Sequence, residues 1–373
     1  MIRVMVRSLL SLLFMGLFSS WVAASEWTHG MKAGTPEFKS MGPLAFGPEG
    51  ILFAADSKAA ALFAIDTGDT TAASDAGELK VEAINEKIAA LLGTGPEEVL
   101  INDMVVNPIS RNVYLAISRG RGPDAIAVLV RVGSDGAPHV VSLDGIRFSR
   151  CEIPNAPADV ETGEGRRRRN SRMQSITDIG FLDDRVLVAG ISNEEFASNL
   201  RSIPFPFGRV DEGTSVEIYH GAHGQFETRS PVRTFVPYSV EGEPHLVAAY
   251  TCTPLVQFPL EELKPGAKIR GKTIAELGNR NRPLDMIVYQ QDGKDCLLLA
   301  NSSRGIMKID AEHLAGAEGI EDHVDGGGTK GVAYETIESW TGIDQLDRLD
   351  EMHALVVRKD ESGSMDLETL PLP

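Results

Sequence analysis

The stretch "PLAFGPEGILFAADSKAAALFAID", residues 43 to 66, reads as a short strand, a Gly/Pro turn, an apolar strand that ends at Asp56, a polar corner and a third strand. The same order returns along the chain. The further copies lie at 103 to 132, 178 to 205, 232 to 260 and 284 to 310, with a looser one from "GVAYETIESW" to "MHALVVRKDESGSMDLETL". Short strands with turn residues at even spacing are typical of radial all-β repeats. The sequence therefore predicts an all-β fold, a six-bladed β-propeller with four-stranded antiparallel blades.

This blade pattern, over residues 43 to 370, resembles the broad class of six-bladed propellers that includes the NHL-repeat and gluconolactonase-like proteins. The pair Asn102-Asp103, which opens an inner strand, is similar to the metal-contacting pairs of the lactonase-like group. The resemblance implies the architecture, and at this pair it implies contact with a metal ion.

The N-terminus has the composition of a secretory signal peptide. Arg3 and Arg7 precede an apolar run, and the small residues Ala23 and Ala24 follow it. The run is shorter than the roughly 20 residues that a membrane-spanning helix needs. We therefore expect cleavage of residues 1–24 and release into the periplasm or the medium. We assign residues 25–42 to an N-terminal extension and residues 43–373 to a single propeller domain.

Composition limits the partners of this chain. The formal net charge of −17 disfavours nucleic acid and anionic membrane surfaces. We expect no membrane insertion after signal cleavage, a monomeric chain, and a small-molecule ligand or a protein as partner. Cys151, Cys252 and Cys296 could form one disulfide in an oxidising compartment, and the sequence does not select the pair. Cys296 lies in an apolar run and reads as a buried small hydrophobic residue.

Two segments interrupt the repeat. Residues 79–93 place Val81, Ile84, Ile88 and Leu91 at helical spacing, which predicts an amphipathic helix that covers a blade edge or one end of the channel. Residues 155–173 are polar and include four consecutive arginines, Arg166 to Arg169, which predicts a mobile loop.

Strands of a blade alternate in direction, so two kinds of connection emerge on the same face of a propeller. The corners between second and third strands are Asp56-Ser57-Lys58, Ser118 to Arg121, Ser192 to Glu195, Thr251-Cys252-Thr253 and Asn301 to Arg304. The entries to inner strands are Asn102-Asp103, Gln174 to Asp178, His220 to Arg233, Arg282 to Asp285 and Thr329-Lys330. Since loops on a rigid scaffold carry function, we expect the site at this mouth of the channel. The candidate ligand-binding residues are Asn102, Arg119, Arg121, Glu227, Arg229, Arg282, Asn301 and Arg304.

His220 and His223 lie in the run "IYHGAHGQFETR", where Gly221 and Gly224 predict a loop rather than a helix. Three interpretations stay open. The imidazoles are hydrogen-bonded loop residues, or they contact a ligand, or they bind Zn or Cu with Glu227 or Cys252 as a third ligand.

Three aspartates recur at equivalent positions of the inner strands: Asp103, Asp178 and Asp285. Carboxylates that meet near the axis repel each other unless a cation or an arginine intervenes. One interpretation is a Ca²⁺-like ion, helped by Asn102 and Asn301. The other is a hydrogen bond from each carboxylate to the backbone of a neighbouring blade.

Six arginines fall on the same mouth and could pair with these aspartates or hold an anionic ligand: Arg119, Arg121, Arg229, Arg233, Arg282 and Arg304. Sequence motifs for covalent haem, a serine nucleophile elbow, a P-loop or a dinucleotide are absent from the sequence.

Three hypotheses for the function follow. The first is an exported propeller that binds a small ligand or a partner at its mouth. The second is a divalent-metal hydrolase of the lactonase type, with Asp178 and Asp285 as catalytic residues. The third is a docking scaffold that uses the helix and the arginine segment.

Overall fold

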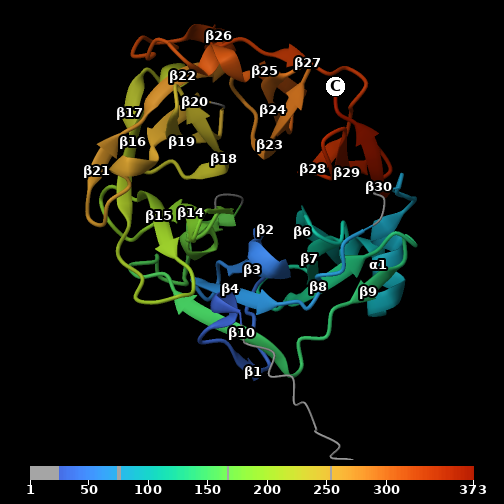
Figure 1. Ribbon diagram of the computed structural model, residues 1–373. Coiled ribbons are helices and arrows are strands. Elements are labelled where there is room, and N and C mark those ends of the chain that lie inside the picture. Colours follow the sequence, from blue (N-terminus) through green and yellow to red (C-terminus); the bar gives the residue numbers. More distant parts are fainter. Residues whose placement is uncertain (1–24, 74–76, 166–167, 253) are drawn as a thin grey trace, which may run out of the picture.

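The computed structural model describes residues 25–73, 77–165, 168–252 and 254–373, which form a six-bladed β-propeller around a central channel (Figure 1). The predicted signal peptide, residues 1–24, lies outside the described residues. Helices of the described residues include none that is long and apolar enough to cross a membrane.

Each blade is one antiparallel sheet, and we number the blades by the order of their inner strands in the sequence. Blade 1 runs outward as β2 (Leu44–Phe46), β3 (Ile51–Asp56), β4 (Ala61–Asp66), β10 (Ile146–Glu152) and β1 (Lys32–Gly34). Blade 2 contains β6 (Val99–Val106), β7 (Val113–Arg119), β8 (Ile126–Val132) and β9 (Pro138–Val140). Blade 3 contains β13 (Asp178–Leu182), β14 (Arg185–Ile191), β15 (Ser198–Pro204) and β16 (Thr214–His220), with β17 (Gln225–Glu227) and β21 (Lys268–Arg270) outside them.

Blades 4 to 6 complete the ring. Blade 4 contains β18 (Val232–Val240), β19 (Glu243–Tyr250), β20 (Pro254–Pro259), β22 (Lys272–Leu277) and β26 (Thr329–Gly331). Blade 5 contains β23 (Pro283–Gln291), β24 (Lys294–Asn301), β25 (Gly305–Asp310) and β27 (Glu335–Thr336). Blade 6 contains β28 (Ile343–Arg348), β29 (His353–Lys359), β30 (Met365–Pro371) and β5 (Lys80–Val81).

The last of the predicted copies needs correction. Residues from "GVAYETIESW" do not open blade 6, because Glu335–Thr336 form the outer strand β27 of blade 5. Thr329 and Lys330, expected at an inner-strand entry, lie on β26 at the outer edge of blade 4. The inner strand of blade 6 begins only at Ile343.

The blades do not follow one another around the ring in sequence order. Neighbouring inner strands are β2, β6, β28, β23, β18 and β13, which returns to β2, so blade 2 lies between blades 1 and 6 (Figure 1). The chain leaves blade 1 after β4, adds β5 to the edge of blade 6, builds blade 2, and only then supplies β10 to blade 1. Blade 2 is thus inserted between the third and fourth strands of blade 1.

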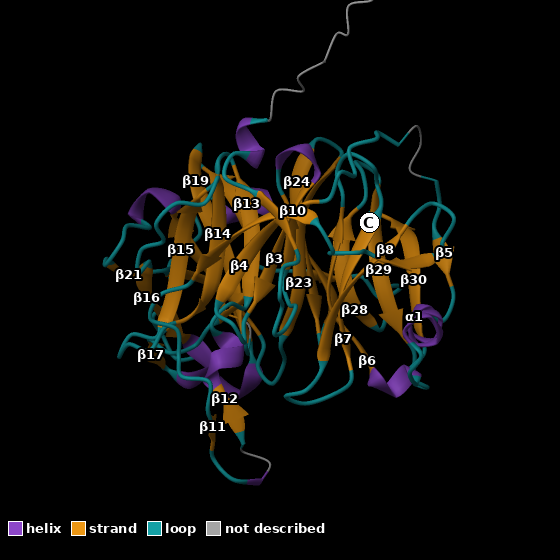
Figure 2. Cartoon of the chain, turned by 90° about the horizontal axis from the view of Figure 1, so that it is seen from below, coloured by secondary structure: helices purple, strands orange, loops and turns teal. Residues whose placement is uncertain are grey.

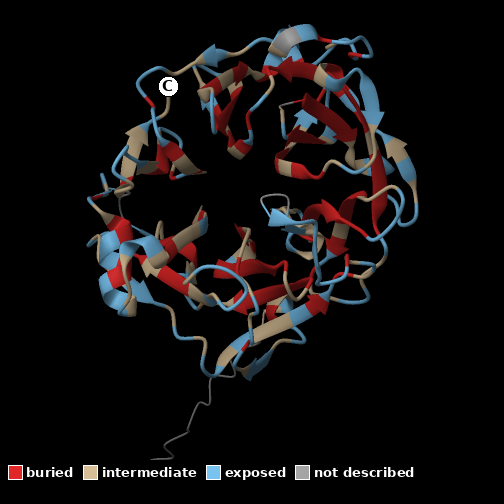
Figure 3. Cartoon of the chain, turned by 180° about the vertical axis from the view of Figure 1, so that it is seen from behind, coloured by how far each residue is buried: buried red, intermediate tan, exposed pale blue. Residues whose placement is uncertain are grey.

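Apolar residues on the second and third strands form the interior of each blade and the contacts between blades. Figure 3 shows the buried residues concentrated in these strands, while exposed residues lie at the outer rim and in the loops. The strand β3, with all six residues buried, illustrates the continuous apolar run that such a strand requires.

The predicted helix is present but shorter than expected. The helix α1 spans Ile84–Leu92, and Val81 belongs to β5 instead. Ile84 and Ile88 are buried among residues of blades 2 and 6, whereas Leu91 is 44% exposed. The helix therefore covers the outer edge where these two blades meet, and it does not close the channel (Figure 1).

The arginine segment also differs from the prediction. Instead of a wholly irregular loop, β11 (Glu161–Thr162) and β12 (Arg169–Asn170) pair as a small hairpin that projects from one face of the propeller (Figure 2). The 3-10 helix η5 (Ser171–Gln174) leads from the hairpin toward blade 3. An ion pair of 3.3 Å between Arg168 and Glu161 crosses the hairpin.

Candidate functional site

One irregularity recurs at the start of four inner strands. In β6, β18, β23 and β28 the pairing register shifts by one residue, and the extra residues are Asn102, Arg233, Leu284 and Asp344. Such a bulge leaves its residue outside the ladder and turns its side chain away from the usual alternation. All four bulged residues line the same cavity.

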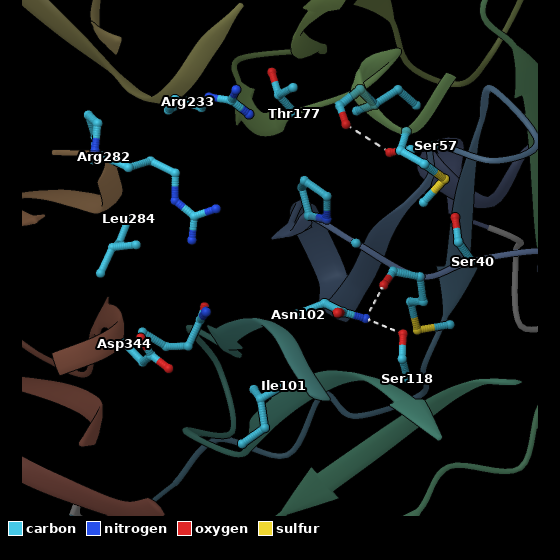
Figure 4. A pocket seen from close by; sticks show the side chains of 17 residues that line it. Ser40, Ser57, Ile101, Asn102, Ser118, Thr177, Arg233, Arg282, Leu284 and Asp344 are labelled. Carbon is cyan, nitrogen blue, oxygen red and sulfur yellow. Dashed lines mark hydrogen bonds between the residues drawn. The ribbon is translucent and has the colours of Figure 1, made fainter. Parts of the chain in front are cut away.

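This cavity, about 450 Å³ in volume, occupies one mouth of the channel (Figure 4). Blades 1 and 3 complete its wall through the segment before β2 and through Ile176 and Thr177. Ser57 and Ser118, which come from second-to-third corners, also line it. Inner-strand entries and two of the predicted corners therefore share this wall.

Two arginines give the cavity its positive charge. Arg282 extends into the open centre in Figure 4, and Arg233 lies beside Thr177. Burial and the nearby charge of Arg282 both lower the pKa of Arg233. Neither arginine forms an ion pair with any described residue, although Asp344 lies in the same wall. Arg233 donates one hydrogen bond, of 3.1 Å, to Thr251 Oγ1.

Asn102 comes from blade 2, and its amide points toward Ser118 (Figure 4). Its Nδ2 donates to the carbonyl of Met41 and to Ser118 Oγ, both at 2.8 Å. The side chain is thereby fixed across the boundary of blades 1 and 2, and its amide oxygen has no hydrogen-bond partner among the described residues.

The other predicted ligand residues lie outside this wall. Arg119 ends β7, and Arg121 donates to the carbonyl of Glu97 at 2.7 Å. Arg229 is exposed on the way into β18, and Arg304 lies against Gly278. Asn301 is buried and accepts hydrogen bonds from the backbone of Ser303 and Arg304. Of the predicted ligand residues, Asn102 and Arg282 line this cavity.

The three predicted aspartates and Asp347 surround the channel below this mouth. They line a smaller cavity of about 180 Å³. Each accepts a backbone hydrogen bond from the inner strand of a neighbouring blade: Asp103 from Leu44 at 2.5 Å, Asp178 from Phe235 at 2.8 Å, Asp285 from Leu346 at 3.0 Å and Asp347 from Val106 at 2.7 Å. This is the second of the two interpretations given for them.

Burial raises the pKa of all four carboxyl groups, to about 7 for Asp178 and to about 6 for Asp347. The charge of Asp103 raises the pKa of Asp285 further. In the described residues, no three of these carboxylates bring their oxygens within 4.8 Å of one another. These three aspartates therefore do not bring their carboxylate oxygens together as the alternative interpretation, a Ca²⁺-like ion, would need.

His220 and His223 lie at the end of β16 and in the 3-10 helix η6 (Gly221–His223), not in an irregular loop. Gly221 starts the helix where its missing side chain lets Glu276 approach, because a Cβ there would lie 2.9 Å from Glu276 Cγ. Glu227 binds Nδ1 of His220 at 3.1 Å and Nδ1 of His223 at 2.5 Å. These hydrogen bonds lower the pKa of Glu227 to about 2, although burial alone would raise it.

All three cysteines are free. Cys151 lies in the core of blades 1 and 3, and Cys296 lies in the core of blades 5 and 6, as expected for a small hydrophobic residue. The single disulfide that the sequence allowed is therefore not formed. Cys252 is half-buried at the β19–β20 corner.

A second cavity adjoins the mouth. It measures about 780 Å³ and lies between the β11–β12 hairpin and the corners of blades 1 and 2. Ser40, Ser118 and Met173 line both cavities, so the two spaces are contiguous.

No family model matches the chain, and no curated protein matches it. Solved structures resemble it at low identity. The PQQ-bound aldose sugar dehydrogenase of Streptomyces coelicolor is 12% identical, with 91% of this chain and 96% of that chain covered and a TM-score of 0.29. A gluconolactonase of Xanthomonas campestris is 10% identical, with 92% and 89% covered and a TM-score of 0.31. These likenesses concern the propeller arrangement and not the chemistry.

Proposed function

We propose that this chain is an exported propeller that binds a small anionic ligand at the mouth of its channel. The observation that carries the proposal is the set of four register shifts, which aim Asn102, Arg233, Leu284 and Asp344 into one cavity. Bulges of this kind are common next to functional sites, because they re-aim side chains.

The arginine pair defines the chemical class of the ligand. Two guanidinium groups in a partly buried wall repel each other, and an anion between them would relieve that repulsion. Guanidinium groups donate paired hydrogen bonds to carboxylate or phosphate oxygens. Asp344 and the amide oxygen of Asn102 supply acceptors for hydroxyl groups at the other side. A hydroxylated carboxylate or phosphate of metabolite size therefore fits this wall, and the volume of about 450 Å³ suits it.

The proposal is tested by titrating the mature chain with citrate, gluconate, glucose 6-phosphate and inorganic phosphate in a calorimeter. We expect at least one of these anions to bind. Loss of one charge-assisted hydrogen bond removes about 1.5–3 kcal/mol, so Arg282→Ala and Arg233→Ala should each weaken binding by about 10- to 100-fold.

Arg229→Ala is the matched control, because Arg229 is exposed near the same rim but outside the cavity wall. Binding that is equal in Arg282→Ala and in the unchanged chain would refute the mouth as the anion site. A protein captured through the β11–β12 hairpin, with no anion bound, would favour the docking scaffold instead.

Export belongs to the same proposal and is tested separately. We propose that residues 1–24 are removed on secretion, on the strength of Arg3, Arg7 and the apolar run that follows them. N-terminal sequencing of the protein from its native compartment should begin near Ser25. A protein that starts at Met1 and stays in the cytoplasm would contradict this part of the proposal.

A further inference from the structure

We propose that His220, His223 and Cys252 form a Zn²⁺ site on the rim of blades 3 and 4. One ligand atom from each of these residues lies within 4.8 Å of the other two. Ligand atoms around a tetrahedral zinc ion lie about 3.3–3.7 Å apart, given Zn–N of about 2.0–2.1 Å and Zn–S of about 2.3 Å. Closing onto an ion therefore needs shifts of about 1 Å, within the reach of side-chain torsions.

Glu227 already orients both imidazoles as a zinc site requires. It accepts from the two Nδ1 atoms at once, at 3.1 Å for His220 and 2.5 Å for His223, and Ser230 Oγ donates to the same carboxylate. Histidines that bind zinc usually donate their second ring nitrogen to a carboxylate, which fixes the tautomer. Both Nε2 atoms are thereby left with a lone pair for an ion, and the two rings lie with centroids 3.9 Å apart.

The second observation is a buried polar atom without a partner. His220 is 2% exposed, and its Nε2 has no hydrogen-bond partner among the described residues. A buried nitrogen in that state loses its hydration without compensation. The buried Oε2 of Glu276 also has no such partner, and Oε1 of the same carboxylate accepts from the backbone of Gly221 at 2.6 Å. A cation at the imidazoles would compensate the ring nitrogen of His220.

Cys252 reaches the site through an unusual backbone conformation. Its φ of 63° lies in the left-handed region, which is unfavourable for a non-glycine residue. Its N–H donates to the carbonyl of Asn281 at 2.9 Å, which holds the corner in place. Cys252 is half-buried and has no disulfide partner, so its sulfur is available as a thiolate ligand.

The donor set selects the metal. Two imidazoles and a thiolate suit zinc and copper, whereas calcium and magnesium prefer oxygen ligands. Three protein ligands leave a fourth position open, and the exposed side chain of His223 marks the side that faces solvent. Thr251, next to Cys252, accepts the hydrogen bond from Arg233 of the mouth cavity. The metal site and the mouth are therefore neighbours on one rim.

The test uses the mature chain after dialysis against a chelator. We expect one equivalent of Zn²⁺ in a calorimetric titration, and Co²⁺ in its place should give the near-ultraviolet charge-transfer absorption of a thiolate ligand. Cys252→Ser should abolish that absorption, and Cys252→Ser and His223→Ala should each weaken Zn²⁺ binding at least tenfold. Glu227→Gln should weaken it about 10- to 100-fold through loss of ligand orientation.

His245→Ala is the matched control, because the imidazole of His245 on β19 bonds, among the described residues, to the carbonyl of Glu243. Cys252 and His223 are not core residues, so their variants should fold, and a melting curve without metal checks this. Zinc binding that is unchanged in both variants, or absent from the unchanged chain, would overturn the proposal. Copper rather than zinc in protein from its native compartment would overturn the choice of metal. None of these variants removes Arg282. Anion binding at the mouth can therefore be measured in each of them, and its outcome does not depend on the outcome for zinc.

Discussion

Asp178 is an example of the four carboxyl groups that line the channel. Each of them accepts a hydrogen bond from a neighbouring blade. Its Oδ2 accepts from the backbone of Phe235 in blade 4, and its Oδ1 accepts from the backbone of Ile179. A carboxyl oxygen can accept such bonds whether the group is protonated or ionised. Burial nevertheless penalises the ionised form, so the pKa of Asp178 rises to about 7.

The first prediction concerns the pH dependence of stability. Because the pKa of Asp178 is higher in the folded chain than its unfolded value of about 3.9, the native state binds more protons between these two values. The contribution of Asp178 to stability therefore falls as pH rises from about 4 to about 7. We expect the melting temperature of Asp178→Asn to fall less over this range, measured by calorimetry at several pH values.

Asp292→Asn in the exposed β23–β24 turn serves as the control for that measurement, and its pH profile should follow the unchanged chain. If Asp178→Asn instead kept the full pH dependence, the ionisation of this carboxyl group would not limit stability.

For single residues, the sequence predicted that Asp103, Asp178 and Asp285 lie near the axis, because each precedes apolar residues of an inner strand. It missed Asp347, because the copy that contains it was read in the wrong register. The sequence also did not predict that Asn102, Arg233, Leu284 and Asp344 occupy equivalent bulges and line one cavity. A bulge depends on which residues of the neighbouring strand are paired, and one strand read alone does not contain that information.

A second prediction tests the close contact between Gly190 and the backbone of Ser175 near the mouth. A Cβ on Gly190 of β14 would lie 2.1 Å from the carbonyl oxygen of Ser175, in the segment that leads to the cavity wall. Since backbone must move to admit it, Gly190→Ala should destabilise the chain by about 1–3 kcal/mol in urea unfolding. Gly208→Ala, where a Cβ would meet nothing within 4 Å, should change stability by less than about 0.5 kcal/mol. Equal effects of the two substitutions would contradict this account.

The helix α1 raises the question of what an inserted element contributes to a propeller. Ile88 is fully buried among side chains of blades 2 and 6, while Leu91 on the same helix is 44% exposed. The third prediction is that Ile88→Ala lowers the unfolding free energy by about 2–5 kcal/mol. Leu91→Ala should cost less than about 0.5 kcal/mol. If Ile88→Ala changed the unfolding free energy only slightly, the packing of the helix against blades 2 and 6 would not contribute to stability.

The extent of this helix could be predicted only in part. Apolar spacing identified the helical segment, but it also included Val81, which pairs with Leu367 in β5. Strands of two or three residues leave too short a pattern to recognise. For the same reason β11 and β12 were taken for irregular chain, although an ion pair and a ladder join them.

Over the whole molecule, the ring is held together by strands that come from distant parts of the sequence. Blade 1 receives its fourth strand after blade 2, and blade 6 receives β5 from the segment before blade 2. The predicted six-bladed fold was confirmed. It could be predicted because the order of short strands and turns recurs along the sequence. The order of the blades was not predictable, since it depends on pairings of β5 and β10 that leave little trace in residue type.

The fourth prediction follows from this interlocking. Trp27 packs against Phe205 and Phe181 near blades 1 and 3, and Trp340 lies in the core of blades 5 and 6. A chain expressed without residues 1–24 holds these two tryptophans alone, so Trp27→Phe and Trp340→Phe each leave one fluorescent reporter. We expect the two reporters to show coincident urea midpoints, because no blade can leave the ring alone. Two separated midpoints would indicate independent halves.

The placement of β5 and β10 also bears on how the chain is made. Ribosomes release residues from the N-terminus onward, so Lys80 and Val81 emerge long before β30, their partner strand at Met365–Pro371. Blade 1 likewise waits for Ile146–Glu152 before its edge is covered. A nascent chain therefore carries open sheet edges until translation is almost finished. Such edges invite aggregation until the last strands have been added.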